Sequence, residues 1–399
     1  MSELPWWAVR SKFWSLAALA TVVGVACVSM YFSGDGGNAV AASPAAASSG
    51  AGRAFFSSVD SAPGPATAPA SRRQELVTQL TFADHTYCNY KDSTKYPNFS
   101  RPIGEHPDQV YPNAPVTESH AARLDGGGTD PKIQVHTSQS RVFLASGESV
   151  AFAISARDAT GNPIQLFVNR AVANPIAYKG VRAPAPVTVP FSESGDASLT
   201  PSRTNLAAFN GTIRTEVHYT AGGQAGSVLF DVIYTPELPA TWSGAVREAL
   251  EGGSINFYLK ADVRVAGRYL VSGRVDDARG QPFAYVSFND LLPAGTGEVK
   301  LTVFGKLMLD RQAALPLVLR DVDGYLLNEN TDPDRALMPR LEGKVFASKM
   351  RTLDGVADTE WQSEERQRYL AEFRKDVEAA RSELARFAPG EALPPSACK

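Results

Sequence analysis

The longest apolar run of the chain covers residues 13–32 and contains no charged side chain. A helix of about twenty residues, rising about 1.5 Å per residue, spans a hydrocarbon layer of about 30 Å. Arg10 and Lys12 precede the run, and Asp35 is the first charge after it. Because basic residues stay on the cytoplasmic side, the pattern predicts a transmembrane signal-anchor, with residues 1–12 inside the cell and everything after residue 32 outside.

Two other interpretations of this run stay open. A cleaved signal peptide could use the small residues Ala39 and Ala41 as its cleavage site. A lipoprotein signal could use Cys27, which lies inside the run. All three interpretations export the rest of the chain.

Polar and small residues dominate next. Residues 33–74 are rich in Ala, Ser, Gly and Pro, and such a stretch buries too little apolar surface to order itself, which predicts a disordered linker. Residues 75–132 carry five closely spaced prolines, at positions 97, 102, 107, 112 and 115, among many aromatic residues. Since proline is excluded from helix interiors and central strands, we expect an irregular segment that covers a neighbouring domain.

Short apolar or alternating runs, separated by turn signals, fill residues 133–236. The runs at 141–145, 149–156, 212–220 and 227–234 have strand length, and the Gly pair at 222–223 predicts a hairpin between the last two. This spacing is typical of a β-sandwich rather than of α/β units.

Residues 237–335 repeat the theme, with strand candidates at 254–263, 267–275, 283–288 and 299–305. The sequence between Asp276 and Pro282 predicts a turn. The run SGAVREALE at 243–251 is rich in helix formers, so we expect one or two helical turns there.

The second module resembles a known family. It contains Gly267-x-Tyr269, then an Asp277-x-x-Gly280 turn, then a Leu292-x-x-Gly295 turn, and a strand that ends in Phe304-Gly305. This order is similar to that of the immunoglobulin-like sandwiches of exported bacterial proteins, many of them domains of unknown function. The resemblance covers residues 254–322 and, by architecture alone, residues 133–236. It implies a mainly β fold with two tandem immunoglobulin-like sandwiches, and no catalytic residues.

The remaining residues, 336–399, are expected to form a linker and an amphipathic helix at 358–387. Its apolar residues recur at spacings of three and four, which places them on one stripe. We expect this stripe to dock onto a sandwich, with self-association through the helix as the alternative. The stripe consists of Leu370, Phe373, Val377, Ala380, Leu384 and Phe387.

Composition narrows the function. The chain has 39 Lys and Arg against 42 Asp and Glu, a net charge of −3, which argues against a nucleic-acid partner because such a partner requires a basic surface. No G-x-S-x-G, H-E-x-x-H or P-loop motif occurs. We therefore expect no enzyme activity.

Some residues could still bind metals or partners. The segment 84–120 holds zinc-type ligands, and the stretch 321–334 holds carboxylates of the kind that bind calcium, but neither has a known ligand spacing. We expect no cofactor, and calcium or zinc are the alternatives. The metal candidates are His85, His106, His120, Asp321, Asp323, Asp332 and Asp334. The aromatic candidates for contacts with a partner are Tyr87, Tyr90, Tyr96, Phe99 and Tyr111.

The chain has three cysteines. Because Cys27 lies in the apolar run, export leaves Cys88 and Cys398 in an oxidising compartment, and we predict a disulfide between them. Two free thiols are the alternative.

Together these features predict a single-pass protein of the bacterial inner membrane, anchored by residues 13–32, with most of the chain in the periplasm. Its expected role is non-catalytic binding, adhesion or scaffolding, with an envelope protein or a glycan as partner. The alternative is a metal-dependent envelope enzyme, or an enzyme accessory subunit, that uses the segment 84–120.

Overall fold

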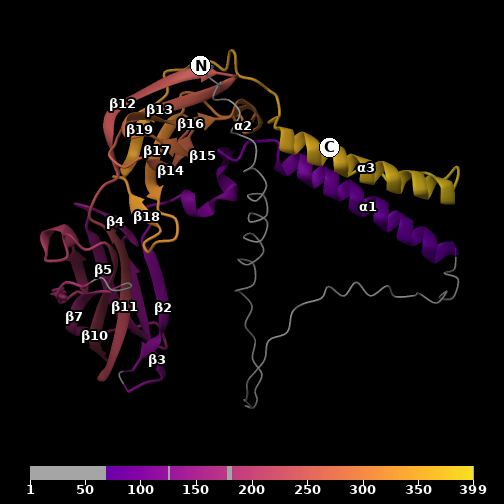
Figure 1. The fold of residues 1–399 in the computed structure, drawn as a ribbon. Helices are drawn as coiled ribbons and strands as arrows, with labels where there is room; N and C mark the ends of the chain where they lie inside the picture. Colours follow the sequence, from indigo (N-terminus) through magenta and orange to yellow (C-terminus); the bar gives the residue numbers. More distant parts are fainter. Residues whose placement is uncertain (1–68, 125, 178–181, 399) are drawn as a thin grey trace, which may run out of the picture. The chain divides into compact units, whose positions relative to one another are not determined.

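The computed structural model describes residues 69–124, 126–177 and 182–398 (Figure 1). The fold is mainly β, with several sheets and a C-terminal helix. In this part of the chain the strands form two β units, each with its own hydrophobic core. Helices α1 (Pro69–Ser93) and α3 (Glu364–Phe387) pack together as a helical pair. The predicted anchor at 13–32 and the linker up to residue 68 lie outside the described residues.

The first β unit consists of two sheets that enclose one core. One sheet has the order β4-β11-β10-β7-β8, and the other has the order β2-β3-β5-β6, with β9 paired to β5. The strands are β2 (Val116–Arg123), β3 (Thr129–Gln139), β4 (Phe143–Ala145), β5 (Val150–Asp158), β6 (Pro163–Ile164), β7 (Leu166–Pro175), β8 (Val187–Thr188), β9 (Asp196–Leu199), β10 (Gly211–Ala221) and β11 (Gln224–Thr235).

The second β unit has the same two-sheet plan. One sheet runs β1-β15-β14-β17-β18, with β19 also paired to β17, and the other runs β12-β13-β16. The elements are β1 (Ser100–Pro102), β12 (Ala240–Glu251), β13 (Ser254–Val263), β14 (Gly267–Asp276), β15 (Pro282–Leu292), β16 (Gly295–Val303), the short helix α2 (Gly305–Asp310), β17 (Val318–Leu327), β18 (Arg335–Leu337) and β19 (Leu341–Ala347).

The strand predictions for both units are confirmed where the sequence alternates. Along β10 every second residue is buried, as expected for a strand with one face on a core. The predicted hairpin joins β10 to β11 through Gly222 and Gly223, which have φ values of +55° and +81°. Glycine adopts these values without strain, and they match the right-handed twist of the two strands.

Each β unit contains a turn with nearly the same sequence, which is DATGNP at 158–163 in the first unit and DARGQP at 277–282 in the second. In each turn the first aspartate accepts hydrogen bonds from the backbone N–H groups two and four residues later, at 2.8 to 3.1 Å. The glycine has a φ of +88° in the first turn and +76° in the second. One side chain therefore organises the same backbone path in both units.

Tyr269 explains the G-x-Y motif of the second unit. Its ring is fully buried, and its hydroxyl donates its one proton between the carbonyl oxygens of Val265, at 2.6 Å, and Pro239, at 3.1 Å. Burial raises the pKa of Tyr269 to about 12. The hydroxyl ties the start of β14 to the preceding chain, as the tyrosine corner of sandwich domains does.

The helical prediction for residues 243–251 is wrong, because they belong to strand β12. Val246 lies opposite Leu259 and Leu250 opposite Ile255 in the ladder with β13. Tertiary pairing along an existing sheet therefore outweighs the helix propensity of Ala, Arg, Glu and Leu, which differs from that of strand formers by well under about 1 kcal/mol per residue.

The segment 75–132 is only partly irregular, because residues 94–115 form turns and short elements on the second β unit, whereas the residues on either side of them are regular. Helix α1 begins at Pro69, inside the predicted linker, and ends at Ser93, before the first of the clustered prolines. Pro69 stands at the start of the helix, where proline is tolerated. Further on, β1 pairs with β15 and β2 pairs with β3, so the prolines punctuate short elements of both β units. The first unit therefore begins before the predicted boundary at 133, and the second unit includes β1 and extends past 335, with β19 in what was expected to be a linker.

The C-terminal helix is confirmed, beginning at Glu364 rather than at residue 358. Ser363 caps it by accepting a hydrogen bond from the Arg366 N–H at 3.1 Å. Among the helices of the described residues, none is long and apolar enough to cross a membrane.

Candidate functional site: a disulfide-clasped helical pair

Helices α1 and α3 lie side by side and run antiparallel (Figure 1). Arg72, at the start of α1, forms an ion pair with Glu383, near the end of α3, at 2.8 Å. At the other end, the buried Arg366 donates to the Thr94 hydroxyl (3.0 Å) and to the Lys91 carbonyl (3.2 Å). These contacts fix the register of the pair.

The seam between the helices is apolar but thin. Leu76 and Leu80 of α1 are buried against Val377 and Leu384 of α3. Their half-buried neighbours in the seam are Val77, Ala83, Tyr87 and Ala380. The predicted stripe of α3 therefore packs on α1 and not on a sandwich, which corrects that expectation.

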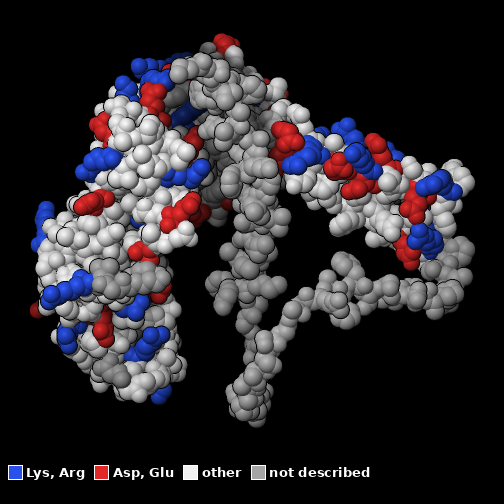
Figure 2. Space-filling view, in the orientation of Figure 1, with Lys and Arg blue, Asp and Glu red and all other residues white. Residues whose placement is uncertain are grey.

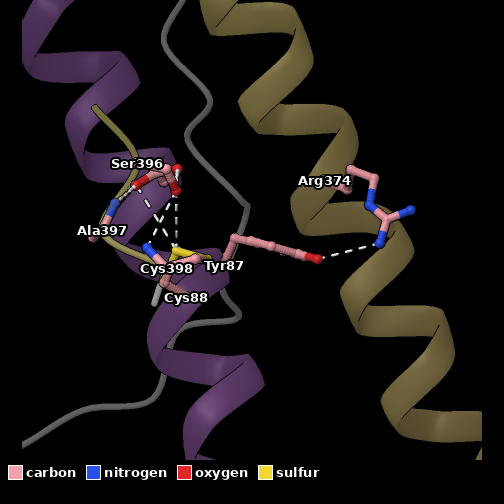
Figure 3. The surroundings of a disulfide bond; sticks show 7 residues. Tyr87, Cys88, Arg374, Ser396, Ala397 and Cys398 are labelled. Carbon is pink, nitrogen blue, oxygen red and sulfur yellow. Dashed lines mark hydrogen bonds between the residues drawn. A yellow bond between two sulfur atoms is a disulfide. The ribbon is translucent and has the colours of Figure 1, made fainter. Parts of the chain in front are cut away.

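A disulfide between Cys88 and Cys398 clasps the pair (Figure 3), as predicted from the cysteine positions. The two Cα atoms are 5.0 Å apart, and 310 residues separate the cysteines along the chain. Beside the disulfide, the buried Asp84 accepts hydrogen bonds from the Ser396 hydroxyl (2.7 Å) and the Ala397 N–H (2.5 Å). The last residues of the described chain are thus held against the middle of α1 by one covalent bond and two charge-assisted hydrogen bonds.

Aromatic side chains join the helical pair to the second β unit. The Trp361 ring packs edge-to-face against Phe99 at 5.4 Å and against Phe304 at 6.2 Å. Nearby, the Tyr96 hydroxyl donates to Asp310 at 2.7 Å. Burial and this hydrogen bond raise the pKa of Tyr96, so the phenol stays neutral.

Most of the aromatic residues proposed for partner contacts are therefore engaged within the chain. Tyr96 lies in the core of the second β unit, Phe99 packs on Trp361, and Tyr90 packs on Tyr369 and Phe373 of α3. Tyr87 accepts a hydrogen bond from Arg374 at 3.2 Å. Tyr111 differs, because 75% of its surface is exposed.

The histidines proposed as zinc ligands have separate surroundings. His85 is exposed on α1, His106 stacks on Tyr285 with ring centroids 4.2 Å apart, and His120 lies on β2. Within the described residues, no three His, Cys, Asp or Glu side chains are arranged to hold a metal ion.

The acidic residues proposed for calcium have other partners. Asp321 accepts a hydrogen bond from the Gly343 N–H at 2.7 Å, and Asp323 accepts one from the Ser272 hydroxyl at 2.8 Å. Asp334 pairs with Arg335, which lowers the pKa of its carboxyl, and Asp332 is the exposed residue before a cis-proline.

A nearly buried charge network, which was not predicted from the sequence, lies on the outer face of the sheet that contains β14. Arg274 contacts Asp276 at 3.0 Å and Asp321 at 3.5 Å, and each of these side chains is about a tenth exposed. Burial raises the pKa of Asp276, although Arg274 and Arg320 oppose the shift. Arg274 also donates to the Val110 carbonyl, so the network holds the loop before β2 on the sheet. Charged residues alternate in the same way along a strand whose outer face is exposed to solvent. The sequence alone therefore does not show that these side chains are buried.

On the face shown in Figure 2, acidic and basic side chains are interspersed along the helical pair. Ion pairs such as Lys375 with Glu372 (2.7 Å) and Arg72 with Glu75 (3.2 Å) account for this mixture. The helical pair therefore offers no strong field of one sign on the face drawn.

Comparison with known proteins gives only distant similarities. No protein-family model matches the sequence, and no curated protein matches it. A DUF4785 family protein from Legionella pneumophila is 16% identical over 54% of this chain and 57% of its own length, with a TM-score of 0.37. The adhesin InvE from Yersinia pseudotuberculosis is 13% identical over 52% of this chain and 58% of its own, with a TM-score of 0.17. A DUF3823 family protein from Bacteroides ovatus is 11% identical over 46% and 91%, with a TM-score of 0.18. These scores are too low to establish a shared fold.

Proposed function

We propose that this chain is an exported, membrane-tethered binding or scaffold protein of the bacterial cell envelope, without catalytic activity. Residues 13–32 anchor it in the inner membrane, and two immunoglobulin-like sandwiches with a clasped helical pair face the periplasm, where an envelope protein or a glycan binds. The metal-dependent alternative lacks support, because its ligands are not gathered in the described residues.

The disulfide between Cys88 and Cys398 carries this proposal. Disulfides persist in oxidising compartments, whereas cytosolic thiols are kept reduced. Ser396 and Ala397, next to Cys398, also donate hydrogen bonds to Asp84, one helical turn before Cys88. These hydrogen bonds hold the two cysteines close together. An exported location is the simplest origin for such a built pair.

The location is tested in bacteria that express the full chain. We expect protease to degrade the chain in spheroplasts but not in intact cells, and an alkaline wash to leave it in the membrane pellet. On non-reducing gels, Cys88→Ser and Cys398→Ser should remove the fast-migrating oxidised form. Cys27→Ser, the matched control, should keep it. A protease-resistant chain whose three thiols are all free would contradict the proposal.

The binding role needs a separate experiment. Crosslinking in native membranes, followed by mass spectrometry, should yield a reproducible envelope partner attached to residues after position 69. Hydrolase activity of the purified chain that survives chelation and repurification would overturn the non-catalytic role.

A further inference from the structure

The second β unit has an open edge between strands β12 and β19. These two strands belong to different sheets, since β12 pairs with β13 and β19 pairs with β17. Each is the outermost strand at its place in the sheet, among the described residues. Between them lies a cavity of about 350 Å³. This volume is near the lower end of the range for ligand pockets, about 300–1,000 Å³.

A bulge in β12 opens the cavity. Trp242 lies opposite Ala261 and Val246 lies opposite Leu259, so the three residues between Trp242 and Val246 face Lys260 alone. Gly244, in the middle of the bulge, has a φ of +87°. Bulges bend a strand and are frequent next to binding sites.

The opening is closed at both ends. At one end, the Trp242 indole N–H donates to the Pro339 carbonyl at 2.7 Å. At the other end, Glu248 accepts hydrogen bonds from the Ser348 hydroxyl and from the Lys349 N–H, the latter at 2.8 Å. The gap is therefore a bounded part of the fold and not a frayed edge.

The floor of the cavity is apolar. Four of its side chains are half-buried and pack against the core of the second unit: Trp242, Val246, Leu341 and Val345. Such a floor accommodates apolar side chains and gains free energy when they displace water from it.

The rim is cationic. Lys260, Arg340 and Lys344 line the cavity, and none of them forms an ion pair within the described part of the chain. The single acidic residue of the lining, Glu342, is already paired with Arg141 at 2.9 Å. Lys260 lies opposite Glu298, whose carboxylate is already bound by Arg247, and Arg340 donates to the Phe143 carbonyl at 3.4 Å, so the positive charge most available to a ligand is that of Lys344.

We infer that this cavity binds an extended peptide strand in which acidic and apolar residues alternate. The free edges of β12 and β19 supply backbone donors and acceptors for an added strand. Residues of one parity would point to the apolar floor, and those of the other parity would meet Lys260 and Lys344 at the rim, which are exposed. The inference rests on the proposed binding role and gives it a class of partner.

The test uses the full-length chain in lipid nanodiscs and two fluorescein-labelled pentapeptides, Leu-Glu-Val-Glu-Leu and Leu-Lys-Val-Lys-Leu. Fluorescence anisotropy should show that the acidic peptide binds about tenfold more tightly than the basic one. The rim lysines attract the two Glu side chains of the acidic peptide but repel the two Lys side chains of the basic one. Added salt should reduce the difference.

Three variants sharpen the test. The double variant Lys260→Glu with Lys344→Glu should reverse the peptide preference, whereas Lys132→Glu, on an exposed lysine of the first unit, should not. Ala245→Trp fills the cavity and keeps every rim charge, so it should abolish binding if the peptide occupies the cavity. Circular dichroism checks that each variant stays folded.

Equal affinity for the two peptides, or unchanged binding by Ala245→Trp, would overturn the inference. Displacement of the peptide by stoichiometric dodecanoate would instead assign the cavity to a fatty anion, and loss of peptide binding on self-association would assign it to a second copy. None of these results affects the outcome of the export experiment. Failure of the peptide-binding inference can therefore be distinguished from failure of the proposed location.

Discussion

The β units and the helical pair are stabilised in different ways. Each β unit buries more than twenty apolar residues in one core, among them Tyr234 in the first unit and Phe257 in the second. The helical pair buries four. Helices of this length are marginal unless an apolar face is packed, and here the packed face is narrow.

The covalent clasp compensates for that narrow seam. A disulfide that closes a loop of several hundred residues restricts the unfolded chain by about 5 kcal/mol in the chain-entropy model. The β units contain no cysteine within their strands, and a large buried core stabilises each of them. Where burial is sparse, this protein uses a covalent bond, and the difference can be tested by disturbing one region at a time.

The largest effect is expected in the core of the second unit. Phe257→Ala removes a fully buried ring that packs on Phe346 at 5.7 Å, and it should lower the free energy of unfolding by about 3–5 kcal/mol. Hydrogen exchange should accelerate in β13 and β16. Phe167→Ala, at a ring that is 57% exposed, is the control and should change little. Because Phe167 lies in the first unit, equal losses in both variants would mean that burial does not dominate the stability of the β units.

Loss of the clasp comes next. Cys398→Ser should destabilise the helical pair by about 2–4 kcal/mol, with faster hydrogen exchange in α1 and α3 and unchanged exchange in the first β unit. Mild reduction of the wild-type chain should reproduce the result. If exchange rises equally everywhere, the clasp stabilises the whole chain and the contrast between the regions fails.

A smaller effect is expected in the seam itself. Leu80→Ala should cost about 2 kcal/mol, at the low end for such changes, because a thin seam can collapse around the missing atoms. Phe82→Ala, two residues away at a ring that is 75% exposed, provides the matched control and should be nearly silent. Thermal unfolding followed at 222 nm measures both. A greater loss from Phe82→Ala would show that the outer face of α1 is covered.

The smallest effect is expected at the aspartates of the two similar turns, Asp158 in the first β unit and Asp277 in the second. Hydrogen bonds from Thr160 and Asn162 lower the pKa of Asp158 from 3.8 to about 2. Because the folded-state pKa is the lower one, this stabilisation is complete above about pH 4 and is lost as the pH falls towards 2. Asp158→Asn should make the melting temperature of the first unit less dependent on pH in this window. An unchanged pH profile would assign the acid sensitivity to other groups, including Asp277, whose pKa is also lowered by hydrogen bonds that outweigh its burial.

The sequence predicted the elements whose signals are local. Alternation along 212–220 and the glycine pair that follows it are enough to place a hairpin, because both act within a few residues. The Asp277 turn and the stripe on 370–387 are found for the same reason. The run at 243–251 misled the prediction, since its strand state depends on β13, which lies beyond it in the chain.

Helix α1 could have been found. Leu76, Leu80, Ala83, Tyr87 and Tyr90 recur at spacings of four and three, as the stripe of α3 does, and no proline interrupts them. The prolines after residue 96 led to the prediction that all of residues 75–132 are irregular. The packing of α3 on α1 was therefore not predicted, although the apolar stripes of both helices can be recognised in the sequence.

The cavity and the buried charge network could not be predicted. Both depend on strands that come together from distant parts of the chain, such as β12 with β19 and β14 with β17. Lys260 or Arg274 alone looks like any charged residue on a strand. The cysteine pair is different, because the predicted export leaves two cysteines outside the apolar run and so constrains the pairing without any geometry.

The clasp also changes what a protease can do to this protein. The bond between Cys88 and Cys398 closes nearly all of the described chain into a covalent ring. A single cut at any exposed loop between these residues opens the ring but leaves both fragments attached to α1. When the cuts fall inside the ring, release of either β unit from α1 therefore requires two cuts, or one cut and a reductant.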